Sequence, residues 1–431
     1  MIYLKAAIYT LGCKVNQYES QEMTEMLTKN GYLVVDSKEN ADVYIVNSCT
    51  VTAESNRKTR QAVRKFKSAH PDAVVVMTGC VPQAFPEEAL AVNEADIILG
   101  NKNNYKLIES LNKWFAERER IRNITQHNND DKYTGSVISQ FSGHTRAFIK
   151  IQDGCNRFCS YCAIPYARGR SRSKSIEDIR TELKTLAANG FREVVFVGIN
   201  LSAYGRDIGL SLTDAVKAAE ETDGIERIRL GSLEPDHISD EMIDSFASMS
   251  KFCPQFHISL QSGCDTVLKR MNRHYDSSYY EALVNKLRSA FEDTSITTDI
   301  IAGFPGETQE EFEATVDFVR RIKFEKVHVF PYSIREGTKA AKMDGQLNNS
   351  VKSQRASMLS AVCDEVRGNA FADAKDKIYS VLFETPKNGF QCGYTRNYTP
   401  VLVKSDEDLS GKIADVRITD YNEETCFGTL V

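Results

Sequence analysis

The sequence predicts an α/β protein in three parts: an N-terminal α/β domain with a parallel sheet, a central open (β/α)6 partial barrel, and a small antiparallel β-barrel at the C-terminus. The chain has 431 residues, more than the roughly 100 to 200 of an ordinary domain. Strand-like apolar runs alternate with charged segments of helical length over most of the chain, as in βα units. Near the end this pattern changes to short alternating runs broken by turn residues.

The N-terminal domain is expected to span residues 1–116, where apolar runs of strand type precede charged helical segments. The segment 117–144 is polar and rich in Asn, Asp, Gly and Ser, which predicts a linker. The expected strands of the first domain are Ala6–Thr10, Val43–Val46, Val74–Thr78 and Ile97–Leu99.

Six strand candidates recur through the central part, residues 145–370, at the spacing of βα units. Six units are too few for the eight of a closed barrel, so the barrel is expected to be open. Ser175 with Asp178, and Thr308 with Glu311, are expected to cap two of the intervening helices. The six expected strands are Phe148–Gln152, Val194–Val197, Arg227–Leu230, Phe256–Leu260, Ile296–Ile301 and Lys326–Phe330. Residues 371–431 are expected to form the small β-barrel.

Composition narrows the class of protein. With 42% hydrophobic and 26% charged residues, the chain is typical of a folded soluble protein rather than a disordered or coiled-coil one. No apolar run has the length of a membrane span, and the N-terminus lacks the pattern of a signal peptide, so we expect a cytoplasmic protein. Eleven cysteines without an export signal favour metal or redox use over disulfides.

Cys155, Cys159 and Cys162 lie in a C-x3-C-x2-C run directly after the first strand of the central part. Three cysteines can ligate three irons of a four-iron four-sulfur cluster and leave the fourth iron without a protein ligand. A zinc site completed by a distant residue, or a loop of unpaired thiols, remains an alternative.

This spacing at the end of the first strand of a six-unit βα domain resembles the radical S-adenosylmethionine superfamily. The resemblance implies that the open iron binds the amino and carboxylate groups of S-adenosylmethionine, and that Tyr161, before the last cysteine, lies against the adenine. Gly198 and Asn200 at the end of the second strand, and Gly303 after the fifth, are further candidates for cofactor contact.

Three more cysteines, Cys13, Cys49 and Cys80, each follow an apolar strand and precede a helix. The carboxyl ends of parallel strands meet at one edge of a sheet, so these thiols can converge although they are distant in sequence. Buried structural cysteines are the alternative for one or two of them.

Around these cysteines the whole chain resembles the methylthiotransferase family of radical S-adenosylmethionine enzymes. Residues 16–20 (NQYES) and 164–172 (IPYARGRSR) are most similar to the branch that acts on threonylcarbamoyladenosine in transfer RNA. The resemblance implies an N-terminal three-cysteine domain, a radical core and a C-terminal barrel of the TRAM type. It also implies two 4Fe–4S clusters, the second at Cys13, Cys49 and Cys80.

The implied reaction places a methylthio group on carbon 2 of N6-threonylcarbamoyladenosine at position 37 of the anticodon loop. That C–H bond has no useful acidity, so radical chemistry is needed rather than a general base. A one-electron reductant such as flavodoxin or ferredoxin is implied, and the sulfur source stays open. The alternatives are a sibling enzyme acting on isopentenyladenosine or a ribosomal protein, and, from another class, a zinc-stabilised RNA-binding protein.

Contacts with RNA are expected from local basic patches, because the net charge is only −5. One patch follows Cys49 and one follows Cys162, and a solvated helix face is an equal alternative for the first. In the C-terminal part, alternating tyrosines could stack on bases or simply pack across strands. The candidates are Arg57, Lys58, Arg60, Arg64, Arg168, Arg170, Arg172, Tyr394, Arg396 and Tyr398.

Overall fold

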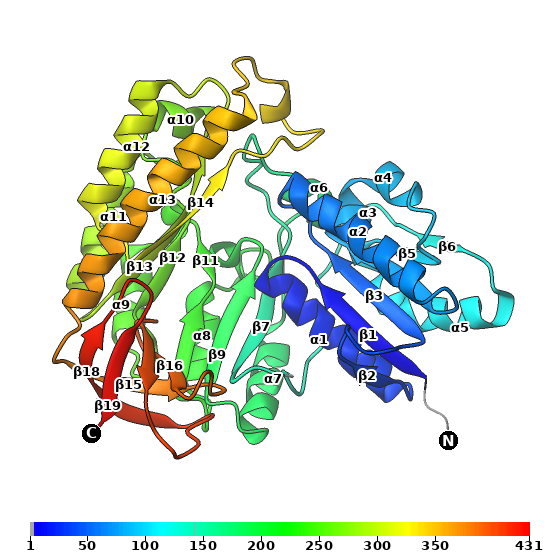
Figure 1. The fold of residues 1–431 in the computed structure, drawn as a ribbon, viewed down its shortest axis with the longest axis horizontal. Coiled ribbons are helices and arrows are strands. Elements are labelled where there is room, and N and C mark those ends of the chain that lie inside the picture. The colour runs from blue at the N-terminus through cyan, green and yellow to red at the C-terminus, as the bar shows by residue number, and fades with distance from the viewer. Residues whose placement is uncertain (1–3, 142) are drawn as a thin grey trace.

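A computed structural model describes residues 4–141 and 143–431 of the protein. The N-terminal domain is a six-stranded sheet in the order β2-β1-β3-β4-β5-β6, and every pair within it is parallel. Figure 1 shows this sheet as a unit beside the rest of the chain. The strands are β1 (Lys5–Thr10), β2 (Leu33–Val35), β3 (Val43–Ser48), β4 (Val74–Gly79), β5 (Ile97–Leu99) and β6 (Ile121–Asn123).

Helices cover both faces of this sheet. Alternate residues of each central strand point to opposite sides, so both faces carry apolar side chains that the helices bury. Tyr44 and Val46 pack with Phe66 on one face, whereas Val43 and Ile45 belong to the core on the other face. Both faces are therefore dry, as expected of a parallel sheet. The helices are α1 (Lys14–Lys29), α2 (Ala53–Ala69), α3 (Cys80–Ala84), α4 (Pro86–Leu90), the 3-10 helix η1 (Asn101–Lys106) and α5 (Leu107–Glu117).

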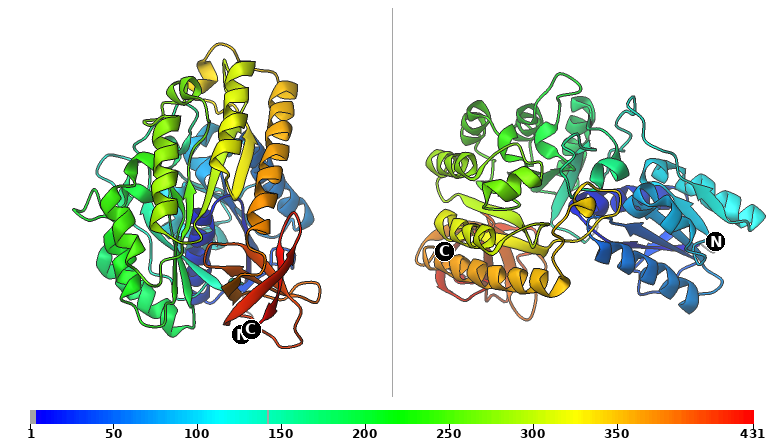
Figure 2. Two further views of the ribbon diagram at one scale, coloured as in Figure 1. Left: turned by 90° about the vertical axis from the view of Figure 1, so that its left-hand side faces the viewer. Right: turned by 90° about the horizontal axis from the view of Figure 1, so that it is seen from above.

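The central part is an open barrel made of two four-stranded sheets, in the orders β10-β9-β7-β8 and β11-β12-β13-β14. An isolated parallel bridge between Ile228 and Phe252 links the two sheets. Seen from above, the helices form an arc around the strands (Figure 2). The strands are β7 (Arg146–Asp153), β8 (Arg172–Ser173), β9 (Glu193–Gly198), β10 (Arg227–Leu230), β11 (Ser232–Leu233), β12 (Gln255–Ile258), β13 (Ser295–Ala302) and β14 (Lys326–Pro331).

Two helices of the central part begin at the caps that the sequence predicts. Ser175 accepts a hydrogen bond from the backbone of Asp178, and Thr308 and Glu311 form a reciprocal capping box. The helices are α6 (Ile164–Arg168), α7 (Ile176–Ala188), η2 (Leu201–Ala203), α8 (Leu212–Glu220), η3 (Pro235–His237), α9 (Asp240–Ala247), α10 (Asp265–Arg270), α11 (Ser277–Ala290), α12 (Gln309–Ile322), η4 (Ala340–Lys342) and α13 (Asn349–Ala372).

The C-terminal part is a closed barrel in the order β15-β16-β17-β19-β18. Its pairs are antiparallel except for β17 with β19, which is parallel. The predicted fold class, including the open partial barrel and the small terminal barrel, is thus confirmed. The strands are β15 (Ile378–Phe383), β16 (Gln391–Thr395), β17 (Pro400–Val403), β18 (Ile413–Tyr421) and β19 (Cys426–Leu430).

One part of the expected linker is not a linker. Strand β6 lies within segment 117–144 and pairs with β5, which extends the N-terminal sheet beyond residue 116. The polar sequence hides this strand because its stability comes from backbone hydrogen bonds to β5 rather than from a buried apolar face. Within the described residues, no helix has the length and apolar character needed to cross a bilayer.

Candidate active site

The loop carrying Cys155, Cys159 and Cys162 is fixed at its start by close backbone packing. Gly154 follows β7 with φ +72°, and a Cβ there would meet the carbonyl oxygen of Arg170 at 2.0 Å. Any other residue would therefore displace the returning chain. The Cys155 N–H donates to the carbonyl of Gly169 at 3.0 Å, which closes the loop around the thiols.

The surroundings of these thiols suit a negatively charged cluster. Arg273 donates an N–H to the Cys159 sulfur at 3.2 Å, and the Arg157 backbone donates to the Cys155 sulfur at 3.4 Å. Burial raises the pKa of the Cys155 thiol to about 11, so a metal is needed to form the thiolate at neutral pH. Arg273 and its partner Glu234 were not predicted, because single charged residues carry no local sequence signal.

Tyr161 and Asn200 lie beside this loop in an arrangement that fits a polar cofactor. Tyr161 lines a cavity of about 200 Å3 together with Gln261 and Tyr332. The Asn200 amide nitrogen lies 3.9 Å from the Cys155 sulfur, and its buried Oδ1 has no hydrogen-bond partner among the described residues. Buried polar atoms without partners are costly, so they indicate a ligand that supplies the missing hydrogen bonds.

Packing explains why glycine occupies positions 198 and 303. A Cβ at Gly198 would lie 2.9 Å from Oε1 of Gln152, and that oxygen accepts the Asn200 N–H. Gly303 has φ +75°, and a Cβ there would meet Lys352 of α13 at 2.7 Å. Contact of either glycine with a cofactor stays a prediction.

The N-terminal thiols come together as the sheet order requires. Cys13, Cys49 and Cys80 follow β1, β3 and β4, which are adjacent strands. A Cβ placed at Gly12 would lie only 2.9 Å from the Cys49 sulfur. Burial raises the pKa of Cys80 to about 12, and also raises that of Cys49. These thiols are therefore protonated unless a metal binds them.

Arg168 and Asn16 hold the loops of this triad. The Arg168 Nε donates to the Cys80 sulfur at 3.2 Å, and its Nη2 donates to Asn16 Oδ1 at 3.1 Å. The Asn16 amide donates to the carbonyl of Ser48, next to Cys49, at 2.8 Å. The side chains of two residues thus connect all three cysteine loops.

Each triad supplies three thiol ligands. Three cysteines can hold three irons of a 4Fe–4S cluster and leave the fourth iron open. Among the described residues, the one group of His, Cys, Asp and Glu ligand atoms that lie within 4.8 Å of one another is His257, Asp299 and His328, which contains no cysteine.

Segment 16–20 (NQYES) forms the interface with the central barrel. Glu19 pairs with Arg168 and Lys150, and the Tyr18 hydroxyl donates to Glu182 at 2.8 Å. Although burial opposes ionisation, Lys150, Arg168 and Arg172 hold the pKa of Asp153 well below its usual value. This buried network fixes the N-terminal domain against the barrel.

One cavity connects the N-terminal triad to the barrel interior. Its volume is about 620 Å3, and it is lined by Cys13 from the first domain and by Gly198 and Asp299 from β9 and β13. The volume lies within the usual range of ligand pockets. A bound ligand in this cavity therefore contacts both domains.

Two predicted RNA contacts are corrected by the structure. Arg168 is 1% exposed and Arg172 is 8% exposed, and both pair with Asp153. The run RGRSR looks like a basic surface patch, but carboxylates from distant segments neutralise it. Arg170 alone of its three arginines is exposed, and it donates to Asn129 at 2.6 Å.

The three C-terminal candidates dock the small barrel onto the core. Tyr394 and Tyr398 stack on each other at 4.6 Å, with the Arg146 guanidinium over both rings. Arg396 donates to the carbonyls of Ser250 and Phe252. The packing alternative is therefore favoured over base stacking, because these side chains already have partners.

The α2 patch lies at the surface, but its arginines are paired. Arg57 pairs with Glu54, Arg60 with Glu88 and Arg64 with Glu94. Lys58 is exposed and has no acidic partner among the described side chains. RNA binding by this patch stays a prediction.

Exposed aromatic residues near the cluster loop were not predicted. Phe158, between two of the cysteines, is 47% exposed, and Tyr166 is 54% exposed. Their rings meet edge to face at 6.5 Å. Aromatic residues at the mouth of a site can stack on nucleic-acid bases. The available signal was the position of Phe158 inside the cysteine motif and of Tyr166 shortly after it.

Three family descriptions match the chain. Residues 149–319 match the radical SAM superfamily, residues 5–100 match the uncharacterized protein family UPF0004, and residues 376–431 match the TRAM domain. The first match implies a 4Fe–4S cluster and S-adenosylmethionine, which the loop at Cys155 and the unpaired amide oxygen beside it fit.

Curated relatives match over nearly the full length. The threonylcarbamoyladenosine tRNA methylthiotransferase MtaB of Bacillus subtilis is 37% identical, over 97% of this chain and 95% of its own. The protein of the same name from Thermotoga maritima is 40% identical with the same coverage. A tRNA-2-methylthio-N(6)-dimethylallyladenosine synthase of Alkaliphilus oremlandii is 35% identical, over 99% of this chain and 93% of its own.

Solved structures support the fold. The radical S-adenosylmethionine methyltransferase TsrM of Kitasatospora setae superposes with a TM-score of 0.58 at 17% identity, covering 79% of this chain and 77% of its own. With three matching family descriptions and full-length relatives at 37–40% identity, the chain belongs to the methylthiotransferase family of radical S-adenosylmethionine enzymes, in the branch typified by MtaB.

Proposed function

We propose that the enzyme methylthiolates carbon 2 of N6-threonylcarbamoyladenosine at position 37 of transfer RNA, using two 4Fe–4S clusters and S-adenosylmethionine. The observation that carries this proposal is the shared cavity, because Cys13 and the barrel strands line the same space. An adenine bound there lies beside Cys13 of the N-terminal triad and against the strands of the barrel. The names of the relatives support the substrate.

In the proposed reaction, the residues of the protein bind and orient the clusters and the substrate, and shield them from solvent. Bound S-adenosylmethionine and the clusters supply the one-electron chemistry that removes hydrogen from an unreactive carbon and delivers sulfur. Cys155, Cys159 and Cys162 would hold one cluster, with Arg273 offsetting its negative charge. Arg168 and Asn16 would keep the second triad at a fixed place beside the cavity.

The partners follow from this chemistry. Transfer RNA is the macromolecular substrate, and a small one-electron donor such as flavodoxin or ferredoxin is the proposed reductant. The reaction is placed in the cytoplasm, where transfer RNA is modified. The sulfur donor is not assigned.

The test uses protein purified and reconstituted without oxygen. We expect about eight irons per chain and, with reductant and S-adenosylmethionine, a methylthio product from transfer RNA that carries threonylcarbamoyladenosine. Mass spectrometry of the digested nucleosides detects this product. Zinc without iron would establish a structural metal protein instead.

A sibling substrate is the second candidate, because the dimethylallyladenosine enzyme of Alkaliphilus oremlandii is 35% identical over nearly the whole chain. The same assay with transfer RNA carrying dimethylallyladenosine decides between them. Product from this RNA alone would reassign the substrate and leave the reaction class unchanged.

Removing the charge of Lys58 is expected to weaken binding of transfer RNA by a few fold, because one phosphate contact is lost. The log-log dependence of affinity on salt should become shallower by about 0.7 to 0.9. Filter binding of the Lys58→Ala variant at several salt concentrations measures both. The control is Lys113→Ala on α5, where the lysine already pairs with Glu117. Equal effects in both variants would remove α2 from the RNA interface.

A further inference from the structure

The central cavity of about 620 Å3 carries an unusual excess of positive charge. Four cations line it, Lys14, Arg146, Arg229 and Lys326, against the single carboxylate of Asp299. Such a cavity attracts an anion, because field lines concentrate between walls of low dielectric.

Two of these cations are already neutralised. Arg146 pairs with Glu384 at 2.7 Å, and Arg229 pairs with Glu193 at 2.7 Å. Both partners lie outside the cavity lining. These arginines therefore hold the small barrel and the strands in place, and the two glutamates neutralise their charges.

Lys14 and Lys326 differ from the arginines, because neither has an acidic partner within the described part of the chain. Lys14 begins α1 directly after Cys13. Lys326 lies on β14, where it alternates with the half-buried Val327 and so faces the interior with His328. Lys14, Lys326 and His328 all line this one cavity, so the two ammonium groups serve the same space. Burial, followed by the charges of neighbouring groups that include both lysines, lowers the pKa of the His328 imidazole.

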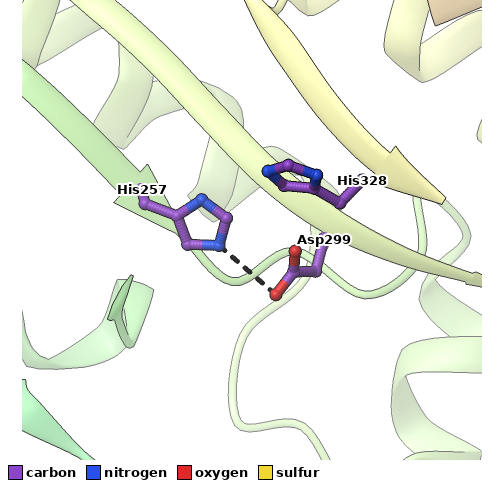
Figure 3. A group of neighbouring side chains, drawn as sticks. All are labelled: His257, Asp299 and His328. Carbon is purple, nitrogen blue, oxygen red and sulfur yellow. Dashed lines mark ion pairs between the residues drawn. The ribbon is translucent and has the colours of Figure 1, made fainter. Parts of the chain in front are cut away.

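The group His257, Asp299 and His328 lines the same cavity, on three consecutive strands (Figure 3). His257 Nε2 is 3.3 Å from Asp299, and its Nδ1 is 3.0 Å from the Thr297 hydroxyl. Two histidines and a carboxylate can bind a metal ion. Here the two ammonium groups of the cavity oppose a dication, and the three side chains remain as hydrogen-bonding groups for a polar ligand.

We propose that Lys14 and Lys326 form a carboxylate-binding subsite that recognises the threonyl end of the N6 substituent. This inference rests on the proposed function and names how that substrate is selected. A threonylcarbamoyl group carries a carboxylate, a hydroxyl and two N–H groups, whereas a dimethylallyl group is an uncharged hydrocarbon. Two unpaired ammonium groups and the polar group around His328 complement the first and leave the second without partners.

The subsite explains discrimination between the two sibling substrates. A site built to bind a polar group rejects an analogue that lacks it, because the polar atoms of the site then lose their partner. A charge-assisted hydrogen bond contributes about tenfold to a hundredfold in affinity. Each lysine is expected to contribute within that range.

The experiment compares anticodon stem-loops bound by the cluster-loaded enzyme with S-adenosylmethionine. One carries threonylcarbamoyladenosine, one its methyl ester, and one dimethylallyladenosine. We expect the wild type to prefer the free acid over the ester by about tenfold or more. Lys326→Met keeps the aliphatic stem of the side chain and removes its charge. This variant should lose the preference for the free acid, whereas its affinity for the methyl ester should be nearly unchanged.

The matched control is Lys217→Met, an exposed lysine on α8 that lies outside the cavity lining. Iron content and melting temperature verify that each variant is folded and loaded. Lys14→Met should also reduce the preference for the free acid, and the double variant should lose more of this preference than either single variant.

The outcomes separate the subsite from the function. Product from threonylcarbamoyladenosine with an unchanged acid preference in Lys326→Met would overturn the subsite alone. Absence of that product with the wild type would overturn the proposed function. A divalent ion retained by the wild type and lost in His328→Ala would make the group a metal site and would also overturn the proposal.

Discussion

Alanine at Cys155 is expected to reduce cleavage of S-adenosylmethionine to background, whereas alanine at Cys49 should leave cleavage intact and stop sulfur insertion. The two thiols belong to different triads, in the loops that follow β7 and β3. If each triad holds one cluster, each variant retains about four of about eight irons. Only the loop at Cys155 lies beside Asn200 and its unpaired amide oxygen, the group that fits the cofactor.

Two measurements distinguish the roles of the two triads. Liquid chromatography measures 5′-deoxyadenosine, the product of cofactor cleavage, and mass spectrometry measures the methylthio nucleoside. The control is Cys392→Ala, which removes a cysteine of the small barrel outside both triads. Equal loss of 5′-deoxyadenosine in the Cys155 and Cys49 variants would show that the triads do not act separately.

Replacing Arg168 with methionine is expected to destabilise the protein by about 3–5 kcal/mol, the usual cost of breaking a buried ion pair from one side. The side chain is 1% exposed and serves Glu19, Asp153 and Asn16 together. Its loss leaves two buried carboxylates with fewer partners and frees the Cys80 sulfur from its donor. The midpoint of urea unfolding measures the change.

Arg170 supplies the matched control two residues away. It is exposed and bonds to one asparagine, so Arg170→Met should change stability by no more than about 0.5 kcal/mol. Iron content after reconstitution is a second readout, since of the two side chains only that of Arg168 bonds to a cysteine sulfur. Similar unfolding midpoints for the two variants would contradict the structural role given to Arg168.

The sequence was informative wherever a local pattern determined the structure. Apolar runs followed by cysteine, such as the one ending at Cys49, predicted both a strand and the edge at which the thiols meet. That prediction needs only the rule that parallel strands end on one side of a sheet. The order β1-β3-β4 then places the three cysteines on neighbouring strands.

The burial of charged side chains such as Arg168 could not be predicted from a local sequence pattern. The partners of Arg168 include Glu19, 149 positions away, and no local pattern connects them. The run around Arg168 therefore looks like a surface patch until the fold places carboxylates against it. Strand β6 was missed for a related reason, because its hydrogen bonds come from β5 rather than from its own sequence.

The sequences of three barrel strands carry a signal for the cavity residues. Lys326 and His328 alternate with the half-buried Val327 and Val329, which is the pattern of a strand with one polar face inside a barrel. His257 and Asp299 hold equivalent inward positions on the two preceding strands. Aligning the inward positions of successive strands would have grouped these side chains.

The buried network between Glu19, Lys150, Arg168 and Asp153 has a consequence for how the enzyme admits its substrate. Apolar surfaces can slide over one another at little cost, but displacement of this interface would leave a charge without its counterpart in a dry environment. The first domain and the barrel are therefore expected to move as one block. If the substrate is the proposed transfer RNA, its target base is expected to leave the stack to reach the cavity, so that the RNA rather than the protein changes conformation.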